Sequence, residues 1–322
     1  MMKDTLLAII ISFAVSAALG PFVIPLLLRL KVGQTVREEG PESHKAKNGT
    51  PTIGGLIFLA GIAVVSVVFG KKYPQMSPVM ILIVAFGLIG FIDDFIKVVL
   101  KRSKGLAAWQ KFTLQFIVTA LFAWFLVRYE NIDLDMIVPF TKKELDPGIL
   151  GLPILFFAVL GTDTGSNFTD GLDGLAASVT AAIALFFMVA AAILGGEAAS
   201  AVSVVSAAVF GGLLGFLLFN ANKARVFMGD TGALALGGYV AGAAYMLHLP
   251  LLLPIVAIIY VIEVASVMIQ VSYFKLTHGK RIFKMAPIHH HFEKCGWSEA
   301  QIMTRFTAVT IIAAAICLIS IL

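Results

Sequence analysis

Paired acidic residues at the end of an apolar segment are the first feature of this sequence that could do chemistry. Asp93 and Asp94 stand side by side in the motif FIDDFIK, and Lys97 follows one helical turn later on the same face. Two carboxylates beside an ammonium group can bind a divalent cation, accept a proton, or do both. A helix end with an ordinary ion pair is the simpler interpretation of this motif taken alone.

A second polar motif, GTDTGSNFTDGLDG at 161–174, is predicted to form a loop because glycines and oxygen-bearing side chains dominate it. Its amide and carboxylate groups, Asn167 and Asp170 among them, suit recognition of a ribose and a base. Asp173 directly precedes an apolar run, so capping of the next helix is the alternative role for its carboxylate.

A third motif, NANKARVFMGDTG at 220–232, leads into another apolar run. Asp230 and Thr231 are predicted to open a helix there, and the free N–H groups of a helix N-terminus bind phosphate. A carboxylate beside a bound phosphate is a natural Mg²⁺ ligand. An ordinary N-cap aspartate is again the simpler alternative.

Two basic segments complete the set of polar motifs. Lys47 begins KNGTPTIGG, a turn that can hold a phosphate although it lacks the spacing of a P-loop. His289, His290 and His291 are consecutive, and three consecutive side chains seldom reach one metal ion. Phosphate binding, proton movement or the ordering of a nearby carboxylate is therefore expected of them.

The elements that must position these motifs are those of an integral membrane protein. Of the 322 residues, 59% are hydrophobic and 13% are charged, whereas a soluble domain has roughly 25% charged residues. We predict an all-α fold and one polytopic membrane domain over 1–322, built from ten membrane-spanning helices. The predicted spans are 5–30, 53–70, 78–100, 109–128, 150–165, 174–194, 200–219, 232–248, 252–278 and 301–321.

The sequence argues against a signal peptide, a cysteine-based site and nucleic-acid binding. The segment 5–30 is too long for a signal peptide. Cys295 and Cys317 stand far apart without a paired motif, so neither a disulfide nor a metal knuckle is expected. The net charge of +5 reflects basic loops, and no nucleic-acid partner is expected.

The distribution of Lys and Arg between the spans predicts their orientation. One alternating set of loops holds 13 of these residues and the other set holds 5. The basic set, which is predicted to face the cytoplasm, comprises 31–52, 101–108, 166–173, 220–231 and 279–300. Both termini then lie outside, and all the polar motifs meet in a cytoplasmic active-site cleft. On the outer side, alternating apolar residues within 129–149 predict a small β-hairpin.

The five motifs together resemble those of the polyprenyl-phosphate N-acetylhexosamine-1-phosphate transferase superfamily, and within it the phospho-N-acetylmuramoyl-pentapeptide transferases. The resemblance covers nearly the whole chain, and its motifs are KNGTPTIGG, FIDDFIK, NFTDGLDG, FMGDTGALALGG and MAPIHHHFEKCGW. The triple histidine is the most specific, because relatives that use GlcNAc-phosphate donors differ there. Departures from the family pattern at 164–168 and 223–224 lie beside the expected functional positions.

The resemblance implies that undecaprenyl phosphate attacks the β-phosphate of UDP-MurNAc-pentapeptide, which releases UMP and forms lipid I. It also implies Mg²⁺ as cofactor with Asp230 as its ligand, a homodimer, and a bacterial plasma membrane with the active site facing the cytoplasm. Motifs and resemblance together predict catalytic roles for Asp93, Asp94, Asp230, His289 and His290. The predicted substrate-binding residues are Lys47, Thr52, Lys97, Asn167, Asp170, Gly171, Leu172, Asp173, Asn220, Phe227, Gly229 and His291.

Other functions fit parts of the sequence. A polyprenyl-phosphate GlcNAc-1-phosphate transferase would share most of the motifs. A membrane transporter or flippase needs ionisable groups along its path, and Glu263 is the lone acid near the middle of a predicted span. A hydrogen bond to a neighbouring helix is the alternative role for Glu263. A structural scaffold explains none of the loop motifs.

Overall fold

Each of the ten predicted spans coincides with a helix in the structure, which is a computed structural model. The described residues are 2–30, 49–99, 105–130, 134–141, 143–221 and 223–322. The ten helices are α1 (Met2–Arg29), α3 (Gly55–Phe69), α4 (Ser77–Val99), α5 (Ala108–Phe125), α6 (Gly151–Thr169), α7 (Leu175–Leu194), α8 (Glu197–Asn220), α9 (Gly229–Met246), α11 (Ile258–Leu276) and α13 (Glu299–Ile321).

Eight helices of the described chain are long and apolar enough to cross a membrane, so the protein is an all-α, multi-pass membrane protein. The eight do not include α3, which has 15 residues, or α9. Every residue of α9 from Thr231 to Met246 is buried. A helix that other helices surround needs small residues for close packing rather than large apolar ones for contact with lipid.

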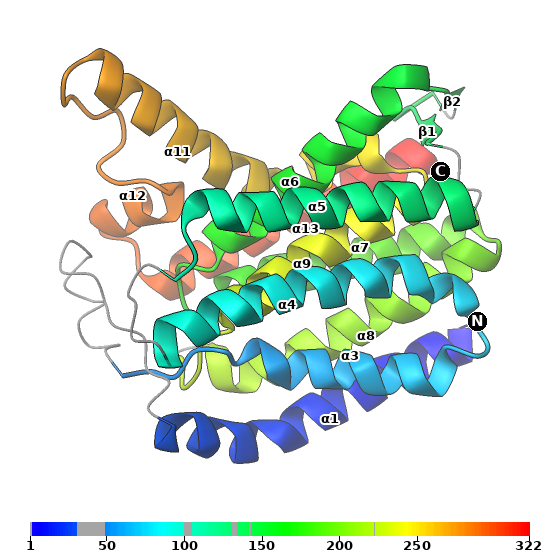
Figure 1. The fold of residues 1–322 in the computed structure, drawn as a ribbon, viewed down its shortest axis with the longest axis horizontal. Coiled ribbons are helices and arrows are strands. Elements are labelled where there is room, and N and C mark those ends of the chain that lie inside the picture. The colour runs from blue at the N-terminus through cyan, green and yellow to red at the C-terminus, as the bar shows by residue number, and fades with distance from the viewer. Residues whose placement is uncertain (1, 31–48, 100–104, 131–133, 142, 222) are drawn as a thin grey trace.

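The two ends of the helix bundle differ in what they carry (Figure 1). Both chain termini lie at one end, together with the strands β1 (Met136–Ile137) and β2 (Glu144–Leu145). The strands pair antiparallel, so the predicted hairpin within 129–149 is confirmed. The short helix α12 (Ile288–Lys294), which carries the three histidines, lies at the opposite end.

Two predicted boundaries are wrong. The first half of the predicted loop 161–174 is helical, because α6 continues to Thr169. Gly165 serves helix packing, because a Cβ atom there would lie 2.5 Å from the Cβ atom of Tyr260 on α11. The predicted span 252–278 is broken at Ala257. The short elements of the chain are η1 (Pro74–Met76), η2 (Leu126–Glu130), η3 (Gly148–Leu150), η4 (Pro250–Leu252) and α10 (Leu253–Val256).

Candidate active site

Three carboxylates from two helices meet at the end of the bundle where α4 ends and α9 begins. Asp93, Asp94 and Asp230 each offer one oxygen atom, and these atoms all lie within 4.8 Å of one another. Asp93 and Asp94 are both 2% exposed. The motifs FIDDFIK at 91–97 and NANKARVFMGDTG at 220–232 therefore meet at these three residues, as predicted.

Two ammonium groups hold this carboxylate cluster together. Nζ of Lys97 lies 2.5 Å from Oδ2 of Asp93 and 2.8 Å from Oδ2 of Asp230. Nζ of Lys111, at the start of α5, lies 2.9 Å from the same Asp230 oxygen. The amide of Asn167 on α6 donates to Oδ1 of Asp230 at 2.9 Å. The Asp230 carboxylate thus receives hydrogen bonds from three different helices.

Asp94 has a different role from its neighbour, because its carboxylate caps the N-terminus of α9 from another helix. Oδ1 accepts from the N–H of Asp230 at 3.2 Å. Oδ2 accepts from the N–H of Thr231 at 2.9 Å and from its hydroxyl group at 2.7 Å. The alternative that Asp230 caps its own helix is therefore wrong: the N-cap position is Met228, and the capping carboxylate comes from α4.

Gly229 lets the motif KNGTPTIGG reach this cluster through Thr52. Its φ angle is +68°, and a Cβ atom there would lie 2.5 Å from Oδ2 of Asp94 and 2.6 Å from the hydroxyl oxygen of Thr52. Only glycine fits a left-handed backbone with that little space. Thr52 and Gly229, both predicted to bind substrate, consequently flank the cap of α9. Lys47, predicted with them, lies outside the described residues.

A second hydrogen-bond network joins the loop 170–174 to the loop 221–228. The carboxylate of Asp173 accepts from the N–H of Ala224 at 2.8 Å. The amide of Asn220 accepts from the N–H of Gly174 at 3.1 Å and donates to the carbonyl of Val226 at 2.9 Å. The predicted capping role of Asp173 is wrong, because Gly174 is the N-cap of α7 and no side chain caps it.

In the chain, Asp170 stands between Asn167, which belongs to the first hydrogen-bond network, and Asp173, which belongs to the second. It is half-buried, and burial together with the negative charges of Asp230, Asp94 and Asp173 raises the pKa of its carboxyl group to about 8. Asn167, in the last turn of α6, donates to Asp230, so the loop 170–174 begins beside the carboxylate cluster.

The remaining predicted loop residues hold the backbone of the site. Leu172 is buried beneath its loop. The N–H of Phe227 donates to the carbonyl of Pro51, and the carbonyl of Phe227 accepts from the N–H of Gly54, each at 2.8 Å. The motifs KNGTPTIGG and NANKARVFMGDTG are therefore tied together through their main chains.

The three consecutive histidines point to three different partners, as expected of residues that do not share a metal ion. The pairs are His289 Nδ1 with Glu263 at 3.0 Å, His290 Nδ1 with Glu293 at 2.6 Å, and His291 Nδ1 with the N–H of Lys284 at 3.1 Å. His289 is 1% exposed. The ring of His289 is thus enclosed, and a direct role in catalysis for it stays a prediction.

Comparison with known proteins connects this geometry to a family. A family model described as glycosyl transferase family 4 matches residues 76–248, which include the carboxylate cluster. A phospho-N-acetylmuramoyl-pentapeptide-transferase of Clostridium perfringens (strain 13 / Type A) is 46% identical over 307 residues, which cover 95% of each chain. The chain belongs to this transferase family. A Caldicellulosiruptor bescii protein of the same name is 47% identical over 309 residues, covering 96% of this chain and 95% of that protein. One from Clostridioides difficile is 45% identical over 312 residues, covering 97% and 96%.

The carboxylate cluster fits a divalent cation. Three carboxylates face two ammonium groups, so the cluster keeps one net negative charge when all five groups are ionised. Nζ of Lys97 already occupies a cationic position between Asp93 and Asp230. Both oxygen atoms of Asp94 accept from the fixed first turn of α9. Asp93 and Asp230 share the ammonium group of Lys97, so these two carboxylates already face a cation and would hold the metal ion.

Two site residues on α5 were missed from the sequence. Lys111 contacts Asp230, and the amide of Gln115, one turn later, donates to the buried carboxylate of Asp163 on α6. Their only signal was two polar side chains four positions apart at the start of an apolar helix, which is also typical of an ordinary span end.

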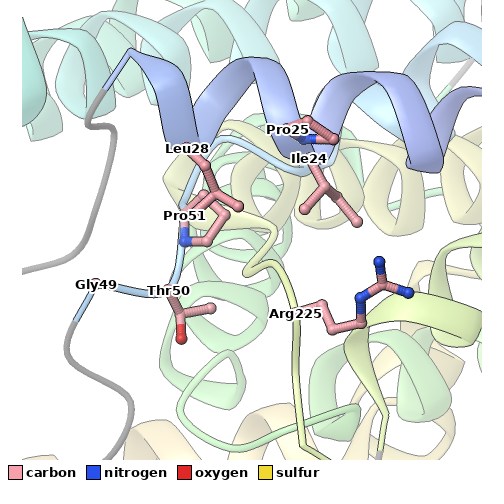
Figure 2. A pocket seen from close by; sticks show the side chains of 7 residues that line it. All are labelled: Ile24, Pro25, Leu28, Gly49, Thr50, Pro51 and Arg225. Carbon is pink, nitrogen blue, oxygen red and sulfur yellow. The ribbon is translucent and has the colours of Figure 1, made fainter.

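A shallow pocket opens beside the site at the end of α1 (Figure 2). Its volume is about 390 Å³, and its lining comprises Ile24, Pro25, Leu28, Gly49, Thr50, Pro51 and Arg225. Among the described residues, none that was predicted to bind substrate or metal lines it. The pocket is therefore separate from the carboxylate cluster, although Thr50 and Pro51 belong to the motif KNGTPTIGG.

Proposed function

We propose that this protein transfers phospho-MurNAc-pentapeptide from UDP-MurNAc-pentapeptide to undecaprenyl phosphate, with lipid I and UMP as products. The observation that carries the proposal is the cluster of Asp93, Asp230, Lys97 and Lys111 at one end of a membrane helix bundle. A soluble diphosphate and a lipid phosphate can meet only at such a membrane surface. The curated relatives named phospho-N-acetylmuramoyl-pentapeptide-transferase support the same reaction.

In the proposed reaction, an oxygen of the lipid phosphate forms a bond to the β-phosphorus of the donor. The bond from that phosphorus to the bridging oxygen breaks, and UMP leaves with the electron pair. Such transfers depend on positioning and charge neutralisation more than on covalent chemistry. Lys97 and Lys111, each within 3 Å of Asp230, are placed to neutralise the phosphate oxygens. Asp93 is placed to orient the lipid phosphate or to accept its proton.

We propose Mg²⁺ as the metal ion, held by Asp93 and Asp230. When bound, Mg²⁺ would withdraw negative charge from the diphosphate oxygens. The preference of Mg²⁺ for one or two carboxylates plus phosphate oxygens supports this assignment.

The uridine is proposed to bind the loop 170–174. This loop follows Asn167, which contacts Asp230, and it is fixed to the loop 221–228 through Asp173 and Asn220. Below a pH of about 8, the Asp170 carboxyl group is mostly protonated and can donate a hydrogen bond to a base carbonyl or a ribose oxygen.

The proposed orientation places the cluster on the cytoplasmic side of a bacterial plasma membrane. The excess of Lys and Arg in the loops at that end supports this orientation. Both termini lie at the opposite end, as an outward position requires (Figure 1). The homodimer that the family resemblance implies is tested by light scattering of the purified protein in detergent.

The experiment that tests the proposal measures UMP release by purified protein in lipid vesicles with undecaprenyl phosphate. UDP-MurNAc-pentapeptide and UDP-GlcNAc are compared as donors at equal concentration. The proposal predicts UMP release with the first donor only, and only when the lipid phosphate is present. Release with UDP-GlcNAc alone identifies the GlcNAc-1-phosphate transferase instead. Absence of UMP release with either donor contradicts a transferase function.

A further inference from the structure

A carboxylate and an imidazole ring are buried together away from the carboxylate cluster. Glu263, in the second turn of α11, is 0% exposed, and His289, on α12, is 1% exposed. Oε2 of Glu263 lies 3.0 Å from Nδ1 of His289. Glu263 therefore makes the interhelical hydrogen bond that was one of its two predicted roles.

The other polar atom of each side chain has no partner among the residues that the structure describes. Oε1 of Glu263 and Nε2 of His289 are both buried without a hydrogen bond. Because a buried unpaired polar atom costs free energy, such a pair is kept only where another constraint requires it. A carboxylate oxygen accepts, so Nδ1 of His289 is the donor in this hydrogen bond, and Nε2 is the ring nitrogen without a partner.

The Nε2 edge of His289 lies directly against the proposed uridine loop. A Cβ atom at Gly171 would be only 2.2 Å from Nε2 and 2.6 Å from the neighbouring ring carbon Cε1. The main chain at Gly171 thus rests on the imidazole ring. Any rotation of the ring would push or release the backbone between Asp170 and Leu172.

Two side chains of α11, Glu263 and Gln270, hold the segment that carries α12. α11 leans away from the rest of the bundle, and α12 lies beside it (Figure 1). The loop that leads into α12 is tied to α11 by the amide of Gln270, which accepts from the N–H groups of Ile282 and Phe283 at 3.2 and 3.0 Å. Of these two contacts, the Glu263–His289 hydrogen bond is the one that reaches the uridine loop.

We propose that Glu263 is a positioning residue that fixes the Nδ1–H tautomer and the orientation of His289, and that the His289 ring in turn supports Gly171 in the loop that binds the uridine nucleotide. This inference rests on the proposed function, because it takes a uridine nucleotide as the ligand of that loop. Under this proposal, Glu263 and His289 increase the affinity of the protein for the nucleotide and do not transport protons across the membrane.

The test measures the equilibrium affinity of the purified full-length protein for UDP in detergent. Glu263→Leu keeps an apolar helix but removes the acceptor, and we expect UDP to bind about tenfold more weakly. Glu263→Gln keeps an acceptor for the Nδ1–H group and is expected to stay within threefold of wild type. Ser266→Ala is the matched control, because Ser266 is also buried one turn along the same helix and its hydroxyl group donates to the Glu263 carbonyl.

A double-mutant cycle separates positioning from general destabilisation. His289→Asn keeps an N–H donor for Glu263 but removes the ring edge from Gly171, so it should also weaken UDP binding about tenfold. Adding Glu263→Leu to His289→Asn should then change affinity less than twofold, because both changes remove the same support. Independent, multiplicative losses contradict the proposal.

The outcomes distinguish this inference from the proposed function. If wild-type protein does not bind UDP, the proposed function fails first. If wild-type protein binds UDP and Glu263→Leu binds it equally well, only the positioning role fails. Where Glu263→Leu does not stay folded, ¹⁵N NMR of the wild-type histidines decides: an unprotonated Nε2 on His289 supports the proposal, and a protonated one overturns it.

Discussion

The substitution Gly90→Ala tests whether the contact between α4 and α9 builds the active site. A Cβ atom at Gly90 would lie 2.1 Å from the carbonyl oxygen of Asp230, 2.3 Å from its carbonyl carbon and 2.6 Å from the nitrogen of Thr231. All three are main-chain atoms of the first turn of α9. They cannot rotate away as a flexible side chain can, so the two helices must separate.

The separation can be worked from these distances. A carbon atom and a carbonyl oxygen approach no closer than about 3.3 Å, so the helices must move apart by roughly 1 Å. The hydrogen bonds from Thr231 to Asp94, now 2.9 and 2.7 Å, would then exceed or approach the limit of about 3.5 Å. Overpacking of this kind costs about 1–3 kcal/mol of stability. A misplacement of about 1 Å at reacting groups costs about 100-fold in rate.

The assay is UMP release in lipid vesicles, with thermal unfolding in detergent as the check on folding. Gly87→Ala is the matched control, because Gly87 faces the same helix one turn earlier and its Cβ atom would meet the methyl group of Ala235 at 3.3 Å. We expect Gly87→Ala to stay within threefold of wild-type activity and Gly90→Ala to lose about 100-fold. A folded Gly90→Ala protein with activity equal to that of Gly87→Ala would refute the reasoning.

Four further outcomes are expected. Lys111→Met removes one of the two ammonium groups on Asp230 and should lower kcat about 10- to 100-fold, whereas an unchanged kcat removes Lys111 from the site. Asp94→Asn keeps an acceptor for the N–H of Thr231, so its unfolding temperature should fall less than that of Asp94→Ala; equal losses contradict the cap. The pKa of Asp170 is about 8 in the folded protein against an ordinary value of 3.8, so its stabilising contribution is full below pH 4 and is lost as pH rises towards 8. The stability of Asp170→Asn relative to wild type should therefore increase over that pH range, and a constant difference would show that the pKa is not raised. Removal of divalent cations with a chelator should abolish UMP release, and Mg²⁺ should restore it; activity that survives chelation contradicts the metal assignment.

Periodicity and composition predicted the ten helices because long apolar runs have few other structures available to them in a membrane protein. They also predicted that distant polar motifs meet, since the loops on one side of a bundle are its only polar surface. The pairing of Asp93 with Lys97 follows from a spacing of four residues in one helix.

Contacts between helices were not predictable from a single sequence. Asp94 caps α9 and Asp173 accepts from Ala224, although local spacing had suggested that Asp230 and Asp173 cap the helices that follow them. Lys111 looks like any basic residue at a span end until the fold brings its ammonium group to Asp230 at the start of α9. Local rules describe what a residue does within its own helix, and these side chains act on another helix.

The segment 161–169 shows that backbone structure, too, could not be fully predicted from local sequence. Glycine, serine and threonine are typical of loops, yet here they extend α6 to Thr169 because small residues allow close contact with α9 and α11. A Cβ atom at Gly237 would lie 2.4 Å from the Cα atom of Asp163. The helix is stabilised by neighbours that the sequence alone does not place.

The central claim is that the Asp230 carboxylate, held by Lys97, Lys111 and Asn167, is the centre of one phosphoryl-transfer site. The most direct measurement is UMP release by Asp230→Asn and wild-type protein in the same vesicles, with UDP-MurNAc-pentapeptide, undecaprenyl phosphate and limiting Mg²⁺. We predict a loss of about 100- to 1,000-fold in kcat for the folded variant. Turnover of Asp230→Asn within threefold of wild type would contradict the claim.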